Sequence, residues 1–132
     1  MKARNWLWLV SLYLLAACAS APTTTPTPEP TIMPGDADAG RALFEQGTLK
    51  IQACATCHSI DGSTDLLGPT LKGIATTAAS RLAGQTAAQY LITSMKTPNA
   101  FLVPNYPADL MPVPEATEQQ YSDLLAYLLT LK

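Results

Sequence analysis

The sequence predicts an all-α domain over residues 36–132. Three observations support this prediction: apolar residues recur at helical spacing, Thr-x-x-Gln pairs precede two of these stretches, and convincing strand patterns are absent from a region rich in Ala and Leu. A domain of fewer than about 100 residues is near the size at which a hydrophobic core alone becomes marginal. A bound cofactor that forms part of the core would therefore help to stabilise it.

The first expected helix has one face formed by residues at i, i+3, i+4 and i+7: Gly40, Leu43, Phe44 and Gly47. The second begins after Thr86, which forms a capping box with Gln89, and ends before Pro98. The third begins after Thr117 with Gln120 as the matching partner. Its apolar stripe comprises Tyr121, Leu124, Leu125, Leu128 and Leu129.

Residues 1–17 have the organisation of a bacterial export signal, with a basic start, an apolar run and small residues before Cys18. The apolar run is about a dozen residues, whereas a membrane-spanning helix needs about 20, which disfavours an uncleaved anchor. The "LAAC" segment resembles the lipobox of bacterial lipoproteins. This resemblance implies lipidation of Cys18 and a lipid-anchored protein on the extracytoplasmic face of a bacterial membrane. Cleavage at another small residue nearby would instead leave a soluble secreted protein.

Residues 18–35 are expected to form the lipidated N-terminus and a linker rich in Pro and Thr. Such a segment favours extended polyproline II, and at about 3.1 Å per residue it could hold the domain up to roughly 50 Å from a bilayer. Removal of Lys2 and Arg4 with the signal leaves six basic residues against ten acidic ones. Since the basic residues are not clustered, the charge argues against nucleic acid as a partner.

Two of the three cysteines adjoin the only histidine in the segment Cys54-Ala55-Thr56-Cys57-His58. A structural zinc site needs four ligands, and the domain supplies only these three Cys and His side chains. A thioredoxin-like dithiol needs alternating strands and helices, a pattern that this domain lacks. Cys-x-x-Cys-His is the attachment motif of c-type haem. It predicts covalent bonds from Cys54 and Cys57 to one haem c, with His58 as the proximal iron ligand.

Met95 and Met111 are the candidates for the second axial ligand, because Met1 belongs to the signal and Met33 to the linker. Met95 shares a helical face with apolar neighbours, which favours core packing. Met111 lies in the irregular segment "NYPADLMPVPEAT" before the last expected helix. A loop of this kind can cross the haem face opposite His58. Ligation by His and Met raises the reduction potential, fills both axial positions and suits electron transfer.

Over about residues 36–132 the chain resembles the class I cytochromes c, and most closely the cytochrome c domains associated with terminal oxidases and related respiratory complexes. The resemblance rests on the segments "GRALFEQG", "CATCH", "GPTLKGIA", "YLITSMKTPNAF", "YPADLMP" and "LLAYLLTLK". It implies a small all-α cytochrome c fold wrapped around one covalently attached haem. The first and last helices would cross at Gly40, with Phe44, Leu124 and Tyr127 packed at the contact.

The same resemblance implies roles for residues near the haem. The Met-Pro dipeptide at Met111 matches the family's axial methionine. The carbonyl of Pro69 would accept the proton of the second imidazole nitrogen, unless Gly-Pro forms a plain turn. Arg81 would contact a haem propionate, with a solvated surface arginine as the alternative. Tyr90 and Tyr106 could serve as propionate donors, or pack in the core or on the surface.

These features predict a membrane-tethered electron carrier of a bacterial respiratory or photosynthetic chain, free-standing or a subunit of a larger complex, and not an enzyme. Its partners would be a quinol-oxidising complex or other donor and a terminal oxidase or other acceptor. Because the domain lacks a lysine-rich ring, an apolar contact or a tether that raises effective concentration would serve for docking. The alternative is a haem-based gas binder or sensor whose Met111 leaves the iron. Peroxidase-type catalysis is disfavoured, since no second histidine exists.

Overall fold

The structure, a computed structural model, describes residues 33–64 and 66–132. The expected signal peptide, Cys18 and most of the linker lie outside these residues. The helices are α1 (Ala37–Gln46), η1 (Cys54–Thr56), α2 (Ile74–Arg81), α3 (Ala87–Lys96), η2 (Pro98–Ala100) and α4 (Glu118–Leu128). The described residues contain no strand, in agreement with the all-α prediction. Within that same part of the chain, no helix has the length and apolar character needed to cross a membrane.

Helix α1 is capped at both ends by its own sequence. The Asp36 carboxylate accepts the backbone N–H groups of Asp38 and Ala39 at 2.8 and 3.2 Å, which satisfies donors that a helix start leaves free. Gly47 ends the helix with a positive φ of +66°, which favours glycine, and donates its N–H to the carbonyl of Leu43 at 2.9 Å. Gly47 is therefore the C-terminal cap and not a member of the packed helical face.

Helices α3 and α4 begin at the two predicted capping boxes. The Thr86 hydroxyl accepts the N–H of Gln89 at 3.2 Å, and the Gln89 side chain accepts the N–H of Thr86 at 2.8 Å. Thr117 and Gln120 repeat this reciprocal pair at 3.2 and 2.9 Å. Helix α3 ends just before Thr97-Pro98, because a proline disfavours helical conformation in the residue before it.

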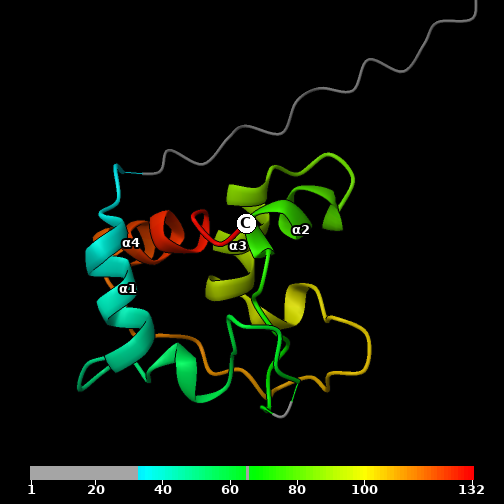
Figure 1. The fold of residues 1–132 in the computed structure, drawn as a ribbon, viewed down its shortest axis with the longest axis horizontal. Helices are drawn as coiled ribbons and strands as arrows, with labels where there is room; N and C mark the ends of the chain where they lie inside the picture. The colour runs from blue at the N-terminus through cyan, green and yellow to red at the C-terminus, as the bar shows by residue number, and fades with distance from the viewer. Residues whose placement is uncertain (1–32, 65) are drawn as a thin grey trace, which may run out of the picture.

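The predicted crossing of α1 and α4 is confirmed, and Figure 1 shows these two helices packed together at one side of the fold. A Cβ atom on Gly40 would collide with the backbone carbonyl of Asp123, so glycine is what allows the two backbones to approach. The rings of Phe44 and Tyr127 pack with their centroids 5.4 Å apart. Leu124 is 1% exposed at the centre of this contact.

The chain enters the domain against the first turns of α4. The Gln119 amide donates to the carbonyl of Pro34 at 3.0 Å and to the Asp123 carboxylate at 2.8 Å. The same carboxylate accepts the backbone N–H of Asp36 at 2.8 Å. These contacts attach residues 34 and 36 to α4.

Helix α2 was not among the expected helices. It follows Gly73, a residue with φ +66° that provides no side-chain cap. The N–H of Ala75 donates to the carbonyl of Leu131 at 3.0 Å, which ties this helix to the C-terminal residues. Helix α2 also packs against α3, so tertiary contacts support a helix that lacks a strong local start signal.

Candidate haem site

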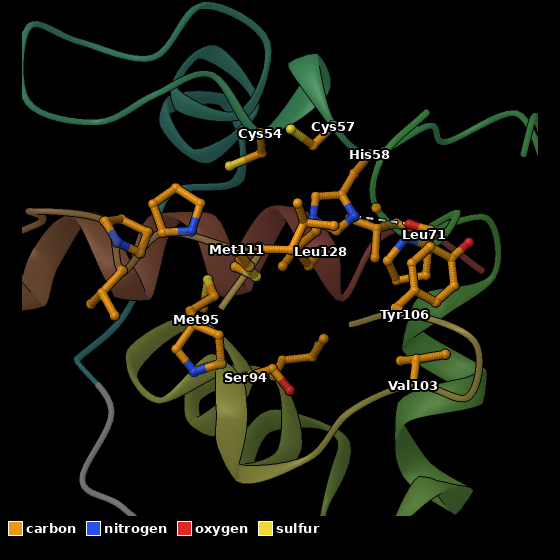
Figure 2. Close-up of a pocket in the computed structure, with 18 of the residues that line it drawn as sticks. Cys54, Cys57, His58, Leu71, Ser94, Met95, Val103, Tyr106, Met111 and Leu128 are labelled. Carbon is orange, nitrogen blue, oxygen red and sulfur yellow. Dashed lines mark hydrogen bonds between the residues drawn. The ribbon is translucent and has the colours of Figure 1, made fainter. Parts of the chain in front are cut away.

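A cavity of about 400 Å³ lies between η1, α3, α4 and the irregular segment 101–115. Figure 2 shows side chains from all of these elements converging on it. Its volume falls in the range of about 300–1,000 Å³ that is typical of cofactor sites. Most of its lining is apolar, and the apolar members include Phe44, Leu71, Ile74, Leu91, Val103 and Leu128.

The Cys-x-x-Cys-His motif forms a tight turn at one wall of this cavity. The carbonyl of Cys54 accepts the N–H groups of both Cys57 and His58, at 3.0 and 2.9 Å. The two bonds wind the backbone so that both thiols lie at one edge of the cavity and the imidazole lies beside them (Figure 2). Burial raises the pKa of the Cys54 thiol, and the nearby Cys57 raises it further.

The imidazole of His58 is held by the next loop. Its Nδ1 atom lies 2.8 Å from the carbonyl oxygen of Pro69 (dashed line in Figure 2). A carbonyl can only accept, so Nδ1 carries the proton and the lone pair of Nε2 remains available to a metal. A Cβ atom on Gly68 would lie 2.5 Å from Cε1 and 2.7 Å from Nδ1 of the ring, so this loop can approach only with glycine at that position.

Both candidate methionines line the cavity. Met111 is half-buried on the irregular segment, and its side chain lies inside the cavity in Figure 2. Met95 is 6% exposed within the hydrophobic core of α3, as its helical spacing predicts. Its position at the cavity was not expected, because its spacing indicated core packing. Leu91, Ser94 and Met95 share one helical face by their spacing, and this pattern is the signal that could have revealed their common position.

The three other residues that the sequence singled out also line the cavity. Arg81 is the last residue of α2 and is half-buried. Tyr90 is buried, with its ring edge-on to Phe101 at a centroid distance of 5.7 Å. Tyr106 is half-buried on the irregular segment. The structure thus brings together all of the predicted site residues that it describes.

The residues present fit a haem group. The cavity has a suitable volume and an apolar lining, and two thiols lie side by side at its edge. An imidazole with a free Nε2 and a thioether are both available as iron ligands. The fold and the site therefore define a small, all-α, monohaem protein of the c type.

Comparison with known proteins gives the family. The sequence profile of the family described as cytochrome c matches residues 37–132. The chain is 32% identical over 144 aligned residues to a cytochrome c2 of Rhodopseudomonas palustris, covering 90% of this chain and 97% of that protein. It is 33% identical over 99 residues to a cytochrome c-553-like protein of Synechocystis sp., covering 75% of this chain and 72% of that protein. This chain belongs to the cytochrome c family, as a class I monohaem member with covalently attached haem c.

Proposed function

We propose that this protein is a membrane-tethered electron carrier on the extracytoplasmic face of a bacterial membrane, serving a respiratory or photosynthetic chain. It acts as a free carrier or as a subunit of a larger complex. The observation that carries this proposal is the presence of an oriented imidazole and a thioether on one apolar cavity, next to two thiols. The cytochrome c family membership supports an electron-transfer role.

In this proposal Cys54 and Cys57 bond covalently to the haem, and His58 and Met111 are the axial ligands of its iron. Bound haem supplies one-electron chemistry. With both His58 and Met111 bound to it, the iron would have no open position for a substrate, which suits electron transfer. The soft thioether favours the ferrous state and raises the reduction potential.

Pro69 is proposed to tune the proximal side. Its carbonyl oxygen, 2.8 Å from Nδ1 of His58, fixes the ring orientation and the tautomer. It also increases the basicity of Nε2, as partners of ligating histidines do. Arg81 is proposed to contact a haem propionate from the end of α2, where it is half-buried at the cavity.

The proposed partners are redox proteins: a quinol-oxidising complex or another donor, and a terminal oxidase or another acceptor. Four apolar side chains of the cavity lining are exposed to solvent at 42% or more: Leu67, Leu102, Leu110 and Val113. They support docking through an apolar surface near the haem edge, in place of a ring of lysines. Such a surface suits brief contacts with the partner, which a tether makes frequent by raising local concentration.

The proposed tether is assigned from the sequence segments that precede the domain. Residues 1–17 are the signal peptide, residues 18–35 the lipidated N-terminus and linker, and residues 36–132 the cytochrome c domain. Expression of the full chain in a bacterium, followed by membrane fractionation, tests this arrangement. The protein should sediment with membranes, and Cys18→Ser should prevent lipid labelling and release it. Equal lipid labelling of the two proteins would contradict lipidation of Cys18.

The ligand assignment is tested by visible spectra of the reduced protein before and after addition of carbon monoxide. Wild type should be unchanged by the gas, whereas Met111→Ala should bind it. Met95→Leu is the matched control, because it replaces the other thioether of the cavity with a side chain of similar volume, and it should behave as wild type. Ready binding of carbon monoxide by wild type would instead favour the gas-binding alternative, in which Met111 leaves the iron.

A further inference from the structure

We propose that two hydrogen-bonded attachments on either side of Met111, one from Asn99 to Asp109 and one from Tyr121 to Pro114, are positioning elements that hold the thioether on the iron. This inference rests on the proposed role of Met111 as axial ligand. It adds the residues that determine how large a fraction of the molecules keep Met111 bound to the iron. None of these four residues is among the proposed ligands.

The segment that carries Met111 has no regular structure to hold it. No helix or strand occurs between η2 and α4, over residues 101–117. Segments of this length without secondary structure are uncommon in compact domains. Two of its residues that are not glycine have left-handed backbones, Asn105 with φ +74° and Asp109 with φ +61°. Contacts with the rest of the domain must therefore define the position of the segment, and these include hydrogen bonds on both sides of Met111.

The first attachment is a reciprocal pair. The Asn99 amide nitrogen donates to the Asp109 carboxylate at 2.7 Å, and the backbone N–H of Asp109 donates to the Asn99 carbonyl oxygen at 3.0 Å. Asn99 belongs to η2, directly after α3, so the pair joins the segment to a regular element. It also holds Asp109 in a left-handed conformation that costs energy in a residue other than glycine.

The second attachment comes from the core. The Tyr121 hydroxyl donates to the carbonyl of Pro114 at 2.7 Å, and Tyr121 itself is only 6% exposed in α4. Lys96 covers its ring, with Nζ 4.9 Å from the centroid, and pairs with Glu118 at 2.6 Å. The Tyr121 hydroxyl is thus held in place by both α3 and α4, and it fixes the position of the Pro114 carbonyl.

Met111 lies between these two fixed points, two residues after Asp109 and three before Pro114. Pro112 and Pro114 restrict φ within the same short span. Asn99 and Pro114 lie at the cavity wall, whereas their partners Asp109 and Tyr121 do not line the cavity and act on the site through Met111. Loss of either attachment should increase the fraction of molecules in which the thioether has left the iron. The apparent affinity for an added ligand rises in proportion to that fraction.

The test is imidazole binding to the ferric holoprotein, followed by absorption, for wild type, Asn99→Ala, Tyr121→Phe and the double variant. A lost net hydrogen bond of about 1 kcal/mol corresponds to about a fivefold change, so Tyr121→Phe, which removes one bond, should bind imidazole about fivefold more tightly. Asn99→Ala removes the two bonds of the reciprocal pair and should bind imidazole at least as tightly as Tyr121→Phe does. The double variant should show a larger increase. The absorption band of the thioether–iron(III) bond should be weaker in the single variants than in wild type and weakest in the double variant. Combining Asn99→Asp with Asp109→Asn swaps donor and acceptor and should restore the wild-type affinity.

Two control variants separate positioning from general destabilisation. Asn105→Gly alters the other left-handed residue of the segment, whose side chain makes no hydrogen bond within the described part of the chain. Ala42→Gly lowers helix stability at an exposed site of α1. Both should leave imidazole binding unchanged. An increase in these controls equal to that of Asn99→Ala would overturn the positioning role.

The remaining outcomes distinguish this inference from the proposed function. If wild type shows the thioether–iron(III) band but Asn99→Ala and Tyr121→Phe bind imidazole as wild type does, Met111 is the ligand and the positioning role is wrong. If wild type lacks the band and binds imidazole as tightly as Met111→Ala does, the ligand assignment itself is wrong.

Discussion

The Nδ1 atom of His58 donates to the carbonyl of Pro69 at 2.8 Å, and the residue before that proline has no side chain to separate the two. Gly68 also donates its own N–H to the carbonyl of Cys57 at 2.8 Å. The loop is therefore joined both to the backbone of the Cys-x-x-Cys-His turn and to its imidazole. These two bonds orient the imidazole without any contribution from a metal.

Gly68→Ala should therefore disturb the proximal side. The added Cβ would lie 2.5 Å from the ring, so the imidazole or the loop must move. We expect a decrease of about 1–3 kcal/mol in the free energy of unfolding, the usual range for overpacking, together with a changed haem absorption spectrum. Guanidinium titration and visible spectroscopy measure the two effects.

Gly84→Ala is the control for this substitution. Gly84 has φ +81° and open space around its Cβ position, so alanine there strains only the backbone. It should decrease stability and leave the haem spectrum unchanged. A wild-type spectrum and wild-type stability for Gly68→Ala would show that the close approach to His58 has no energetic importance.

Gly40→Ala should be destabilising, although alanine is a better helix former than glycine by about 1 kcal/mol. The new Cβ would collide with the carbonyl of Asp123, a backbone atom that cannot turn away. The helices must separate, and the contact between Phe44 and Tyr127 loosens with them. We expect a net decrease of about 1–3 kcal/mol in unfolding free energy, measured by denaturant titration. A variant more stable than wild type would mean that helix propensity outweighs the packing at the crossing.

Asp123→Ala should release the start of the domain from α4. The carboxylate accepts hydrogen bonds from Asp36 and Gln119, both at 2.8 Å, and its loss leaves two donors without that partner. We expect a decrease of about 1–3 kcal/mol in unfolding free energy. Asp123→Asn keeps an acceptor oxygen and should lose less. Equal losses would indicate that the negative charge matters more than the hydrogen bonds.

The phenol of Tyr127 gives a pH-dependent prediction. Burial raises its pKa above the usual value near 10, and Glu45 raises it further, while Arg41 opposes the shift. Above about pH 10 the unfolded chain loses this proton more readily than the folded one, so the folded state binds more protons and stability falls as pH rises. Tyr127→Phe should show a shallower decrease between pH 10 and 11 than wild type, in denaturant titrations at each pH. Identical slopes would contradict a raised pKa.

Local signals explain what could be predicted from the sequence. The capping boxes at Thr86 and Thr117 involve residues three positions apart, so the helix starts can be recognised without knowing the fold. The same holds for the two thiols and the imidazole, since one short turn brings them together. The prediction that Met111 faces the haem rested on its place in an irregular segment and on the family resemblance, and Met111 does line the cavity.

Contacts between distant residues could not be predicted in this way. Helix α2 lacks a side-chain cap and depends on Leu131, far along the chain. The pair of Asn99 and Asp109 spans an irregular segment whose path no periodic pattern describes. Gly47 shows the opposite error, because it fits the helical spacing but ends the helix through its positive φ. Spacing alone does not distinguish the last residue of a helical face from a cap.

The contact between α1 and α4 also sets an order of events during folding. Asp36 and Asp123, which it joins, are 87 positions apart, so the largest part of the core cannot form until the last helix has formed. Cys54 lies between them and is carried on an open chain during that interval. Once the helices have docked, burial keeps its thiol protonated to a higher pH and makes it a slower nucleophile. The distant placement of the two helices thus leaves Cys54 and Cys57 accessible until the core closes around them.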